Sequence, residues 1–383
     1  MTSRPGRRRP AVLHTIPKWG VPSERFVVDL IRSTTLTRPF VACGAIESQP
    51  STGDVDVPVS TITPLIWRVP QRWRKSARAA LIAAVGARRR AQVLHAHFGY
   101  WGIETSIAAR LMRLPWVLSL HGYDVLVIAA REGVPERAKR AGVIVVPSQF
   151  LARAAVAQGY PEDRIRVIPS GLDVSAYTHR VRHARPDGSV HVAFVGRFVP
   201  KKGALDAAGA MAIARQQLRS ELVCTFVGYG PQEQALRDEI TRLRLPATIV
   251  DGRAPTAVRS ALDNADVLLT ASRTSADGDA ESLGLVNLEA QLSGLPVVST
   301  RHGAIPEAVA PDGAVLVPES DVPALGEALA DVARHPERWA AMGSAGRAHV
   351  LRHYQLADRA REVDECYVAL TAAARKSVGA RPH

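Results

Sequence analysis

The sequence is poor in the residues that mark exported, disulfide-bonded or membrane-spanning proteins. Its 383 residues include only three cysteines, which are far apart: Cys43, Cys224 and Cys366. They are odd in number and lack metal-ligand spacing, so a reducing cytoplasm is the expected compartment. No apolar run approaches the length of a membrane span. The first ten residues are basic, but the apolar stretch at 11–16 is too short for a signal-peptide core, so we expect no export.

Aromatic residues are also scarce, at 5% of the chain, and basic residues outnumber acidic ones. The net charge of +13 at pH 7 raises the question of a nucleic-acid partner. We expect none, because the sequence has neither zinc-ligand spacing nor an aromatic-rich RNA-binding strand. The 46% of hydrophobic residues exclude a disordered chain, and 383 residues are enough for two domains with separate cores.

Short apolar runs alternate with helical patterns along both halves of the chain, which predicts an α/β protein with two doubly wound parallel sheets. The expected strands lie near residues 11–15, 93–97, 116–120, 143–146, 190–195, 222–227, 248–250, 267–270, 297–299 and 315–317. We predict a first domain over 1–173, a linker over 174–188 and a second domain over 189–356. A final segment, 357–383, is predicted to be helical as far as Lys376.

The most informative segment runs from Glu281 to Glu289. Leucines at helical spacing and a stop at Gly294 predict a helix that starts between the two glutamates. Free backbone N–H groups and the positive end of the helix dipole would then lie between two carboxylates. Such a site suits a ligand with a phosphate in its middle and hydroxyl groups at both ends, as in a nucleotide sugar. The alternative is a capping carboxylate plus a solvated helix glutamate.

A second candidate element follows the expected strand at 190–195. Gly196 permits close approach of a ligand to the backbone, and Arg197 and Lys202 place two cations on one loop before a helix. A diphosphate suits this loop, since arginine binds it bidentately and lysine acts as a point charge. The alternative is a basic surface turn.

Together these elements resemble the G-R-x-x-x-x-K-G and E-x7-E signatures of the retaining glycosyltransferases of family 4, which have the GT-B fold. The resemblance continues through residues 299–307, Ser-Thr-Arg-His-Gly-Ala-Ile-Pro-Glu. It implies two Rossmann-like domains facing a cleft, with the final helix crossing back to the first domain. It also implies that Glu281 contacts donor-sugar hydroxyls, that Glu289 holds the ribose, and that the diphosphate meets Arg197, Lys202 and the amides of Leu283, Gly284 and Leu285. Ser282 and Leu283 replace the more common Gly and Phe.

The first domain carries candidate acceptor residues. His121 and Asp124 follow an expected strand, where ligands bind in open α/β sheets, and His121 could donate to a sugar hydroxyl or meet developing charge. His121-Gly-Tyr-Asp124 and His95-Ala-His97-Phe98 resemble the H-G-x-D and H-A-H-F elements of polysaccharide-type members of this family. Residues 22–27, with Ser23 and Glu24, resemble their opening motif. Ser170 stands where Asn is usual in the loop 170–173.

Two patterns in the sequence could instead hold a metal ion. His95 and His97 could be ligands, but we expect their side chains on opposite faces of the strand and find no third ligand. Asp54-Val-Asp56 and Asp277-Gly-Asp279 match the D-x-D pattern with which GT-A glycosyltransferases hold a divalent ion. Because Arg197 and Lys202 already supply positive charge, we expect the second pattern to hold no metal and predict that no cofactor is needed.

The excess charge lies entirely in the first half. Residues 1–180 hold 26 Lys and Arg against 12 Asp and Glu, a net charge of +14, whereas residues 181–383 hold 23 against 24, a net charge of −1. Basic residues are densest over 68–90, where they alternate with Trp67, Trp73 and aliphatic residues. This pattern favours docking on an anionic membrane, and the alternative is a solvated arginine-rich helix. We therefore expect a cytoplasmic protein, peripheral on the inner membrane face.

The expected activity is transfer of a hexosyl group, with retention, from a nucleoside diphosphate sugar to a hydroxyl of a glycan or lipid-linked acceptor. Exopolysaccharide or cell-surface glycan synthesis is the expected setting. Two alternatives stay open at this point. One is a GT-B relative with other chemistry, such as a phosphorylase or a sugar-nucleotide epimerase, and the other is a non-catalytic sugar-nucleotide binder.

Overall fold

The computed structural model describes residues 9–47, 57–62 and 66–379, and it divides the chain into two compact units. The first unit comprises residues 1–171 and 356–383, and the second comprises residues 172–355. The possible metal ligands Asp54 and Asp56 lie outside the described residues. No described helix is long and apolar enough to cross a membrane.

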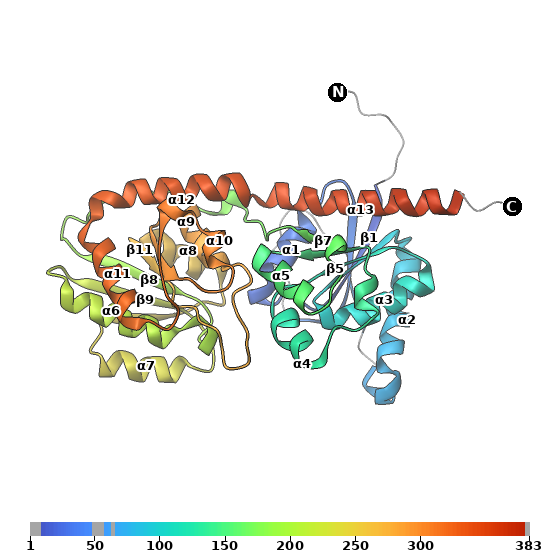
Figure 1. Ribbon diagram of the computed structural model, residues 1–383, viewed down its shortest axis with the longest axis horizontal. Helices are drawn as coiled ribbons and strands as arrows, with labels where there is room; N and C mark the ends of the chain where they lie inside the picture. Colours follow the sequence, from blue (N-terminus) through green and yellow to red (C-terminus); the bar gives the residue numbers. More distant parts are fainter. Residues whose placement is uncertain (1–8, 48–56, 63–65, 380–383) are drawn as a thin grey trace, which may run out of the picture. The chain divides into compact units, whose positions relative to one another are not determined.

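Seven parallel strands form the sheet of the first unit, in the order β3-β2-β1-β4-β5-β6-β7 among the described residues (Figure 1). They are β1 (Ala11–Trp19), β2 (Arg38–Ile46), β3 (Val59–Thr61), β4 (Val93–His97), β5 (Trp116–Ser119), β6 (Val143–Val146) and β7 (Ile165–Val167). The strands β1, β4, β5 and β6 lie where the sequence predicts them. The strands β2, β3 and β7 were not predicted.

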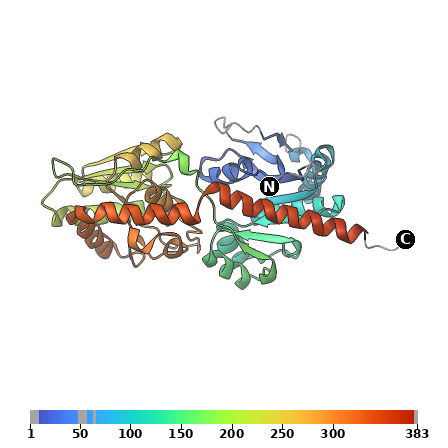
Figure 2. The ribbon, with the colours of Figure 1, turned by 90° about the horizontal axis from the view of Figure 1, so that it is seen from above.

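Helices cover both faces of this sheet (Figures 1 and 2). They are α1 (Arg25–Arg32), α2 (Arg74–Arg89), α3 (Gly102–Met112), α4 (Ala130–Glu132), α5 (Gln149–Ala157) and α13 (Leu356–Gly379). Because side chains alternate along a strand, Leu13 of β1 packs in the core beneath α2 and α3, whereas Val12 packs against Tyr367 of α13 on the other face. Asp364 of α13 accepts hydrogen bonds from the backbone N–H groups of Thr35 and Leu36, each 2.7 Å long, which fixes α13 beside the start of β2.

Six parallel strands form the sheet of the second unit, in the order β10-β9-β8-β11-β12-β13 among the described residues. They are β8 (Val190–Val195), β9 (Leu222–Gly228), β10 (Ala247–Asp251), β11 (Val267–Leu269), β12 (Val297–Thr300) and β13 (Ala314–Val317). All six lie within a residue or two of the predicted positions.

The helices of this unit are α6 (Ala204–Gln217), α7 (Glu233–Arg242), α8 (Pro255–Asn264), α9 (Leu285–Leu292), α10 (Ile305–Ala308), α11 (Val322–Arg334) and α12 (Trp339–His353). The core between the sheet and α6 and α11 is centred on Phe194 and Phe226, and a second core lies beneath α8 and α9. Residues 174–188, expected to be a linker, are held on this unit: buried Arg182 donates to the carbonyls of Leu262 and Asp263.

In both sheets the first strand of the unit lies in the interior and the chain winds outward from it in two directions. This order creates a switch point between β1 and β4 in the first unit and between β8 and β11 in the second. Ligands of doubly wound sheets bind outside the carboxyl ends of the strands at such points. The predicted fold of two Rossmann-like parallel sheets is therefore confirmed, and the GT-A architecture is excluded. The cleft between the two domains stays a prediction.

Candidate functional site

The donor residues predicted from the sequence meet at the switch point of the second unit. The loop after β8 contains Gly196, Arg197 and the short 3-10 turn η9 (Pro200–Lys202), and it leads into α6. The loop after β11 contains Glu281 and leads into α9. Because β8 and β11 are adjacent and parallel, both loops emerge at the same edge of the sheet.

Two ion pairs join these loops. The Lys202 Nζ atom lies 2.6 Å from Oε1 of Glu281, and the Lys201 Nζ atom lies 2.6 Å from Oδ2 of Asp279. The Glu281 side chain is 8% exposed and that of Lys202 is 21% exposed, so the first pair is largely shielded from water. The structure thus brings together two side chains 79 positions apart, both of which the sequence marks as donor ligands.

Electrostatics keep Glu281 ionised. Burial alone would raise the pKa of this carboxyl, but the charges of Lys202 and Lys201 and the Lys202 hydrogen bond lower its pKa to about 2. The neighbouring His302 is 2% exposed, and burial lowers the pKa of its imidazole against the opposing effect of Glu281 and Glu319. The site therefore combines two lysine–carboxylate ion pairs, one of them with the ionised Glu281, and a neutral imidazole.

Close backbone approach explains two glycines in this region. Gly203 has φ of 65°, and a Cβ atom there would lie 2.0 Å from the carbonyl oxygen of Ala271, at the start of the loop after β11. Gly303 has φ of 54°, and a Cβ atom would lie 2.3 Å from the carbonyl oxygen of Glu281. Only glycine lets these loops approach so closely, which fixes Lys202 and Glu281 relative to each other.

The helix α9 is anchored beneath its N-terminus. Thr270 donates to the Asn287 side chain over 3.0 Å and lies 2.6 Å from the Ser299 hydroxyl, which ties α9 to the ends of β11 and β12. Gly284 is the residue before the helix, with φ of 77°, and the side chain of Leu283 is buried in the core. Since the Leu283 side chain faces inward, the backbone amides at 283–285 are the groups that a ligand could use here.

Glu289 and Arg197 differ in their surroundings. Glu289 lies on the second turn of α9 and accepts a 2.8 Å hydrogen bond from the hydroxyl of Tyr177. Arg197 is exposed, and its guanidinium has no hydrogen bond or ion pair to any residue that the structure describes. It is therefore a cation that can reach an anionic ligand without breaking an internal contact.

Three contributors to this site were not predicted from the sequence: Lys201, His302 and Tyr177. Lys201 and His302 lie within the two predicted motifs, at 196–203 and 299–307. A prediction that both lysines of the first loop pair with acidic residues would have included Lys201. Nothing local marks Tyr177, which lies 112 positions from its partner Glu289. The carboxylates of the second D-x-D pattern contact protein groups, since Asp279 pairs with Lys201 and Asp277 accepts from Ser275 over 2.5 Å.

In the first unit, Asp124 organises the loops that follow β4 and β5. Its buried carboxylate accepts hydrogen bonds from the backbone N–H groups of Gly99, His121 and Gly122 at 2.8, 3.0 and 2.9 Å. Phe98, at the end of β4, has φ of 72°, a strained conformation for a bulky residue and one that often marks functional sites. Asp124 thus positions this loop edge, and its carboxylate faces backbone amides.

His121 and His97 lie close together on one face of the sheet. Their rings are nearly parallel with centroids 5.8 Å apart, and Phe26 of α1 and Phe98 pack against His121 at 5.1 and 4.6 Å. Burial lowers the pKa of His121 to about 3, so its ring is neutral. One ring nitrogen can then donate a hydrogen bond and the other can accept one. Of the other candidates, Ser23 is exposed and Glu24 partly buried, in the short turn η1 (Pro22–Glu24) after β1.

The expectation that His95 and His97 point to opposite faces is wrong. Residues i and i+2 of a strand share a face, and the two rings stack with centroids 4.2 Å apart. The expectation that no third histidine is available is also wrong. His14 of the adjacent strand β1 faces the same pair, with its Nδ1 atom 3.2 Å from Nε2 of His97.

Most of the basic segment of the first unit forms α2, and only some of its side chains are exposed to solvent. Arg78 donates two hydrogen bonds to buried Glu104, at 2.6 and 3.1 Å, and lies 5.5 Å from the ring centre of Trp101. Ile82 is fully buried. The exposed cations and large apolar side chains of the segment 68–90 are Arg68, Arg72, Trp73, Lys75, Leu81, Arg88, Arg89 and Arg90.

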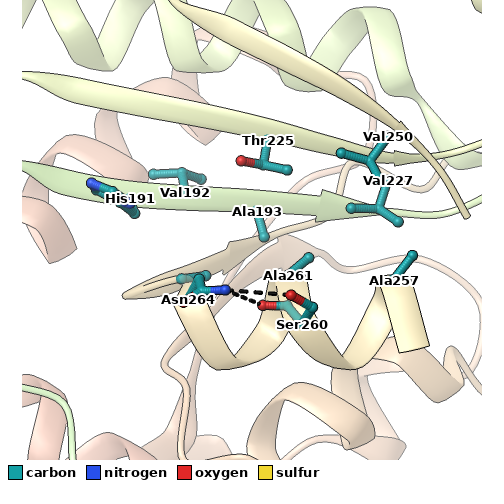
Figure 3. Close-up of a pocket in the computed structure, with 11 residues that line it drawn as sticks. His191, Val192, Ala193, Thr225, Val227, Val250, Ala257, Ser260, Ala261 and Asn264 are labelled. Carbon is teal, nitrogen blue, oxygen red and sulfur yellow. Dashed lines mark hydrogen bonds between the residues drawn. The ribbon is translucent and has the colours of Figure 1, made fainter. Parts of the chain in front are cut away.

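A separate cavity of about 190 Å³ lies in the second unit between α8 and the strands β8, β9 and β10 (Figure 3). Small side chains on α8, such as Ala257 and Ala261, leave this space against the sheet. Of its polar side chains, Asn264 donates to the carbonyl of Ser260. None of the predicted donor residues lines it, so it does not contribute to the candidate site.

Two family models divide the chain between them. The model described as Glycosyltransferase Family 4 matches residues 23–176, and the model described as Glycosyl transferases group 1 matches residues 176–349. The boundary between the two matches falls within a few residues of the boundary between the two structural units at 171–172.

Curated relatives agree with these matches. WcaL of Salmonella typhimurium, named as a colanic acid biosynthesis glycosyltransferase, is 35% identical over 270 residues, which are 67% of this chain and 64% of WcaL. The chain therefore spans less than two thirds of that relative. A GDP-mannose-dependent alpha-(1-6)-phosphatidylinositol monomannoside mannosyltransferase of Mycolicibacterium smegmatis is 31% identical over 266 residues, 65% of this chain and 69% of that protein.

Solved structures share the fold. HepE of Anabaena, solved with UDP and glucose, matches with a TM-score of 0.74 over 94% of this chain and 100% of that one, at 18% identity. Sucrose-phosphate synthase of Thermosynechococcus elongatus matches with a TM-score of 0.74 over 95% of this chain and 100% of that one, at 19% identity. Together the family models, the relatives and the two parallel sheets show that the chain belongs to the family 4 glycosyltransferases, which have the GT-B fold.

Proposed function

We propose that this protein transfers a hexosyl group, with retention of configuration, from a nucleoside diphosphate sugar to a hydroxyl of a glycan or lipid-linked acceptor. The proposed setting is the synthesis of an exopolysaccharide or another cell-surface glycan. Relatives named for colanic acid and amylovoran biosynthesis support this setting. The observation that carries the proposal is the shielded contact between Lys202 and Glu281 at the switch point of the second unit.

The donor fits this site in one orientation. Arg197, Lys202 and the amides at the start of α9 are the positive groups, so they receive the diphosphate. Glu289 lies further along α9, one to two turns past those amides, and receives the ribose hydroxyls. Glu281 is ionised and buried, and it receives the hydroxyls of the transferred sugar, because a carboxylate accepts strong hydrogen bonds from hydroxyl donors. Lys202 touches Glu281, so it lies where phosphate and sugar meet.

The reaction then needs no protein nucleophile. The bond between the anomeric carbon and the diphosphate oxygen breaks on the same face on which the acceptor hydroxyl attacks, and the leaving diphosphate takes the hydroxyl proton. Arg197, Lys202 and the helix amides stabilise the charge that develops on the diphosphate, and they are already in place before the bond breaks. With these positive groups at the phosphates, we propose that no metal is required there. His121 and the loop after β5 are proposed to contact the acceptor.

The donor base is proposed to be guanine or uracil. Two relatives are named as GDP-mannose-dependent, and HepE was solved with UDP and with UDP-glucose. Calorimetry with UDP, GDP and ADP distinguishes the bases directly. Incubation with the matching sugar nucleotide and a lipid-linked acceptor, followed by NMR of the product's anomeric proton, tests transfer and retention together. Inverted product, or release of free sugar 1-phosphate in phosphate buffer, would overturn the assignment.

We also propose that the first unit docks on an anionic membrane surface through the exposed part of the basic segment. The exposed Trp73 and Leu81 supply apolar contact, and the exposed cations of α2 supply attraction of about 1 kcal/mol each. Arg78 is excluded from this surface because Glu104 holds it. A cytoplasmic location on the inner membrane face follows from this proposal and from the nucleotide-sugar donor.

A further inference from the structure

We propose that His14, His95 and His97 form a binding site for one divalent transition-metal ion, with Zn²⁺ as the expected ion. The three side chains are fully buried in the first unit, and each offers a ring nitrogen such that the three nitrogens lie within 4.8 Å of one another. This site is on the sheet face covered by α1 and α13 and is separate from the donor residues of the second unit. It does not depend on the proposed transferase activity.

Strand geometry explains how the cluster arises. His14 of β1 pairs in register with His95 of β4, and His97 is two residues further along β4 on the same face. The Nδ1 atom of His14 and the Nε2 atom of His97 are 3.2 Å apart. Two nitrogens bound to a tetrahedral zinc ion at about 2.0–2.1 Å would be separated by about 3.3 Å, so this pair needs little adjustment to share an ion.

His95 has the outer contacts that metal-binding histidines usually show. Its Nδ1 atom lies 2.5 Å from the hydroxyl of Tyr367 and its Nε2 atom lies 2.7 Å from the hydroxyl of Ser119. Whichever nitrogen binds the ion, the other keeps a hydroxyl that fixes the ring, as second-shell groups do. The hydroxyl on the binding side then becomes available as a fourth oxygen ligand or as a partner for a metal-bound water.

Without an ion, the Nδ1 atom of His14 and the Nε2 atom of His97 share one hydrogen bond. The opposite nitrogens, His14 Nε2 and His97 Nδ1, are buried and have no hydrogen-bond partner among the described residues. An ion held by the first pair of nitrogens would not contact them, so they need an ordered water in either case, since an unpartnered buried polar atom costs about 1–3 kcal/mol.

The chemistry of the ligands selects the ion. Three imidazoles and a hydroxyl favour zinc, cobalt, nickel or copper over magnesium or calcium, which prefer carboxylates and carbonyls. A cavity of about 30 Å³, with room for one water molecule, is lined in part by Ser119, the hydroxyl partner of His95, and not by the three histidines themselves. A bound ion would join β1 and β4 to α13 through Tyr367, so its expected role is to stabilise the first unit.

The test uses the full-length protein without a polyhistidine tag. Metal content is measured by mass spectrometry after expression with zinc, and the metal-free protein is then titrated with Co²⁺, whose visible absorption reports tetrahedral nitrogen coordination. The variants are His97→Asn, which removes a ligand, and Tyr367→Phe, which removes only a hydroxyl. The control is His353→Gln, because His349 and His353 form a surface pair on α12 with ring centroids 4.9 Å apart that could bind metal adventitiously.

The proposal predicts about one tetrahedral Co²⁺ per chain in the wild type and in His353→Gln, no site in His97→Asn, and affinity reduced about 10–100-fold in Tyr367→Phe. It also predicts a melting temperature that rises when zinc is added to the metal-free wild type. Circular dichroism shows whether each variant folds. If His97→Asn does not fold, the metal content and zinc response of the wild type test the proposal. A wild type that holds no metal and does not respond to zinc overturns the proposal, and so does binding that is lost in His353→Gln.

Discussion

Replacing Lys202 with methionine tests the centre of the proposed donor site. Methionine keeps much of the length of the side chain but removes the ammonium group that lies 2.6 Å from the Glu281 carboxylate. Glu281 is 6% exposed, and we expect its carboxylate to stay buried when methionine fills the space of Lys202. We therefore expect a loss of stability of the second unit as well as a loss of activity.

The structure sets the size of the effect. The pKa of Glu281 falls from its usual 4.5 to about 2 on folding, a difference that corresponds to about 3 kcal/mol at neutral pH. Because the folded pKa is the lower one, this stabilisation is present above pH 4.5 and is lost as the pH falls toward 2. Replacing Lys202 removes the largest effect that lowers the pKa of Glu281, while burial, which raises that pKa, remains. The variant should therefore lose up to about 3 kcal/mol of stability at pH 7, and its stability should fall less than that of the wild type on acidification.

Native-state hydrogen exchange of the amides in β8 and β11 measures the stability of this unit separately from that of the first. The matched control is the double variant Lys202→Met with Glu281→Gln, which removes both charges and should recover most of the lost stability. Turnover of Lys202→Met should fall by about 10²–10³, as for loss of one transition-state contact. A single variant that loses less than about 1 kcal/mol, or a double variant no more stable than the single one, would refute the reasoning.

Further measurements separate the other proposed roles. Arg197→Ala should lower turnover by about 10²–10³ with unchanged stability, because its exposed guanidinium has no internal partner among the described residues; near-normal turnover would exclude it from the phosphate site. In calorimetry, Glu289→Ala should weaken free nucleotide and sugar donor alike, whereas Glu281→Gln should weaken only the donor, and equal effects of both would contradict the orientation. Replacing Arg72, Lys75, Arg88 and Arg89 with glutamine should reduce sedimentation with anionic vesicles and leave nucleotide affinity unchanged. Wild-type protein that ignores such vesicles at low salt would exclude the docking surface.

Most of the fold can be predicted from the sequence because its buried strands are short, nearly continuous apolar runs. The strands that were missed lack this property. β2 starts with Arg38-Pro39 and contains Gly44, β3 has three residues, and β7 reads Ile-Arg-Val. They lie at or next to the edges of the first sheet, where fewer residues face a core on both sides and the apolar pattern is weaker.

The residues of the candidate site also differ in how far the local sequence predicts them. Residues whose role depends on the local chain, such as Gly203 or the start of α9, leave a signal in the sequence because turn and helix geometry restrict which residues fit. Partners brought together by the tertiary fold leave none. Tyr177 meets Glu289 across 112 positions, and Arg78 meets Glu104 on a neighbouring helix. The second case matters for function, since the density of basic residues over 68–90 placed Arg78 in the predicted membrane-docking segment, whereas in the structure Arg78 is paired with Glu104.

The histidines of the first unit show how register carries information that periodicity does not. Alternation along β4 places His95 and His97 on one face, but only the pairing of β1 with β4 adds His14, 81 positions before His95. Only the docking of α13 then adds the Tyr367 hydroxyl. Four polar side chains from three elements thus converge in a core that is otherwise mainly aliphatic on this face. Burying these polar groups costs free energy that apolar residues would not, and the hydrogen bonds within the cluster offset only part of that cost.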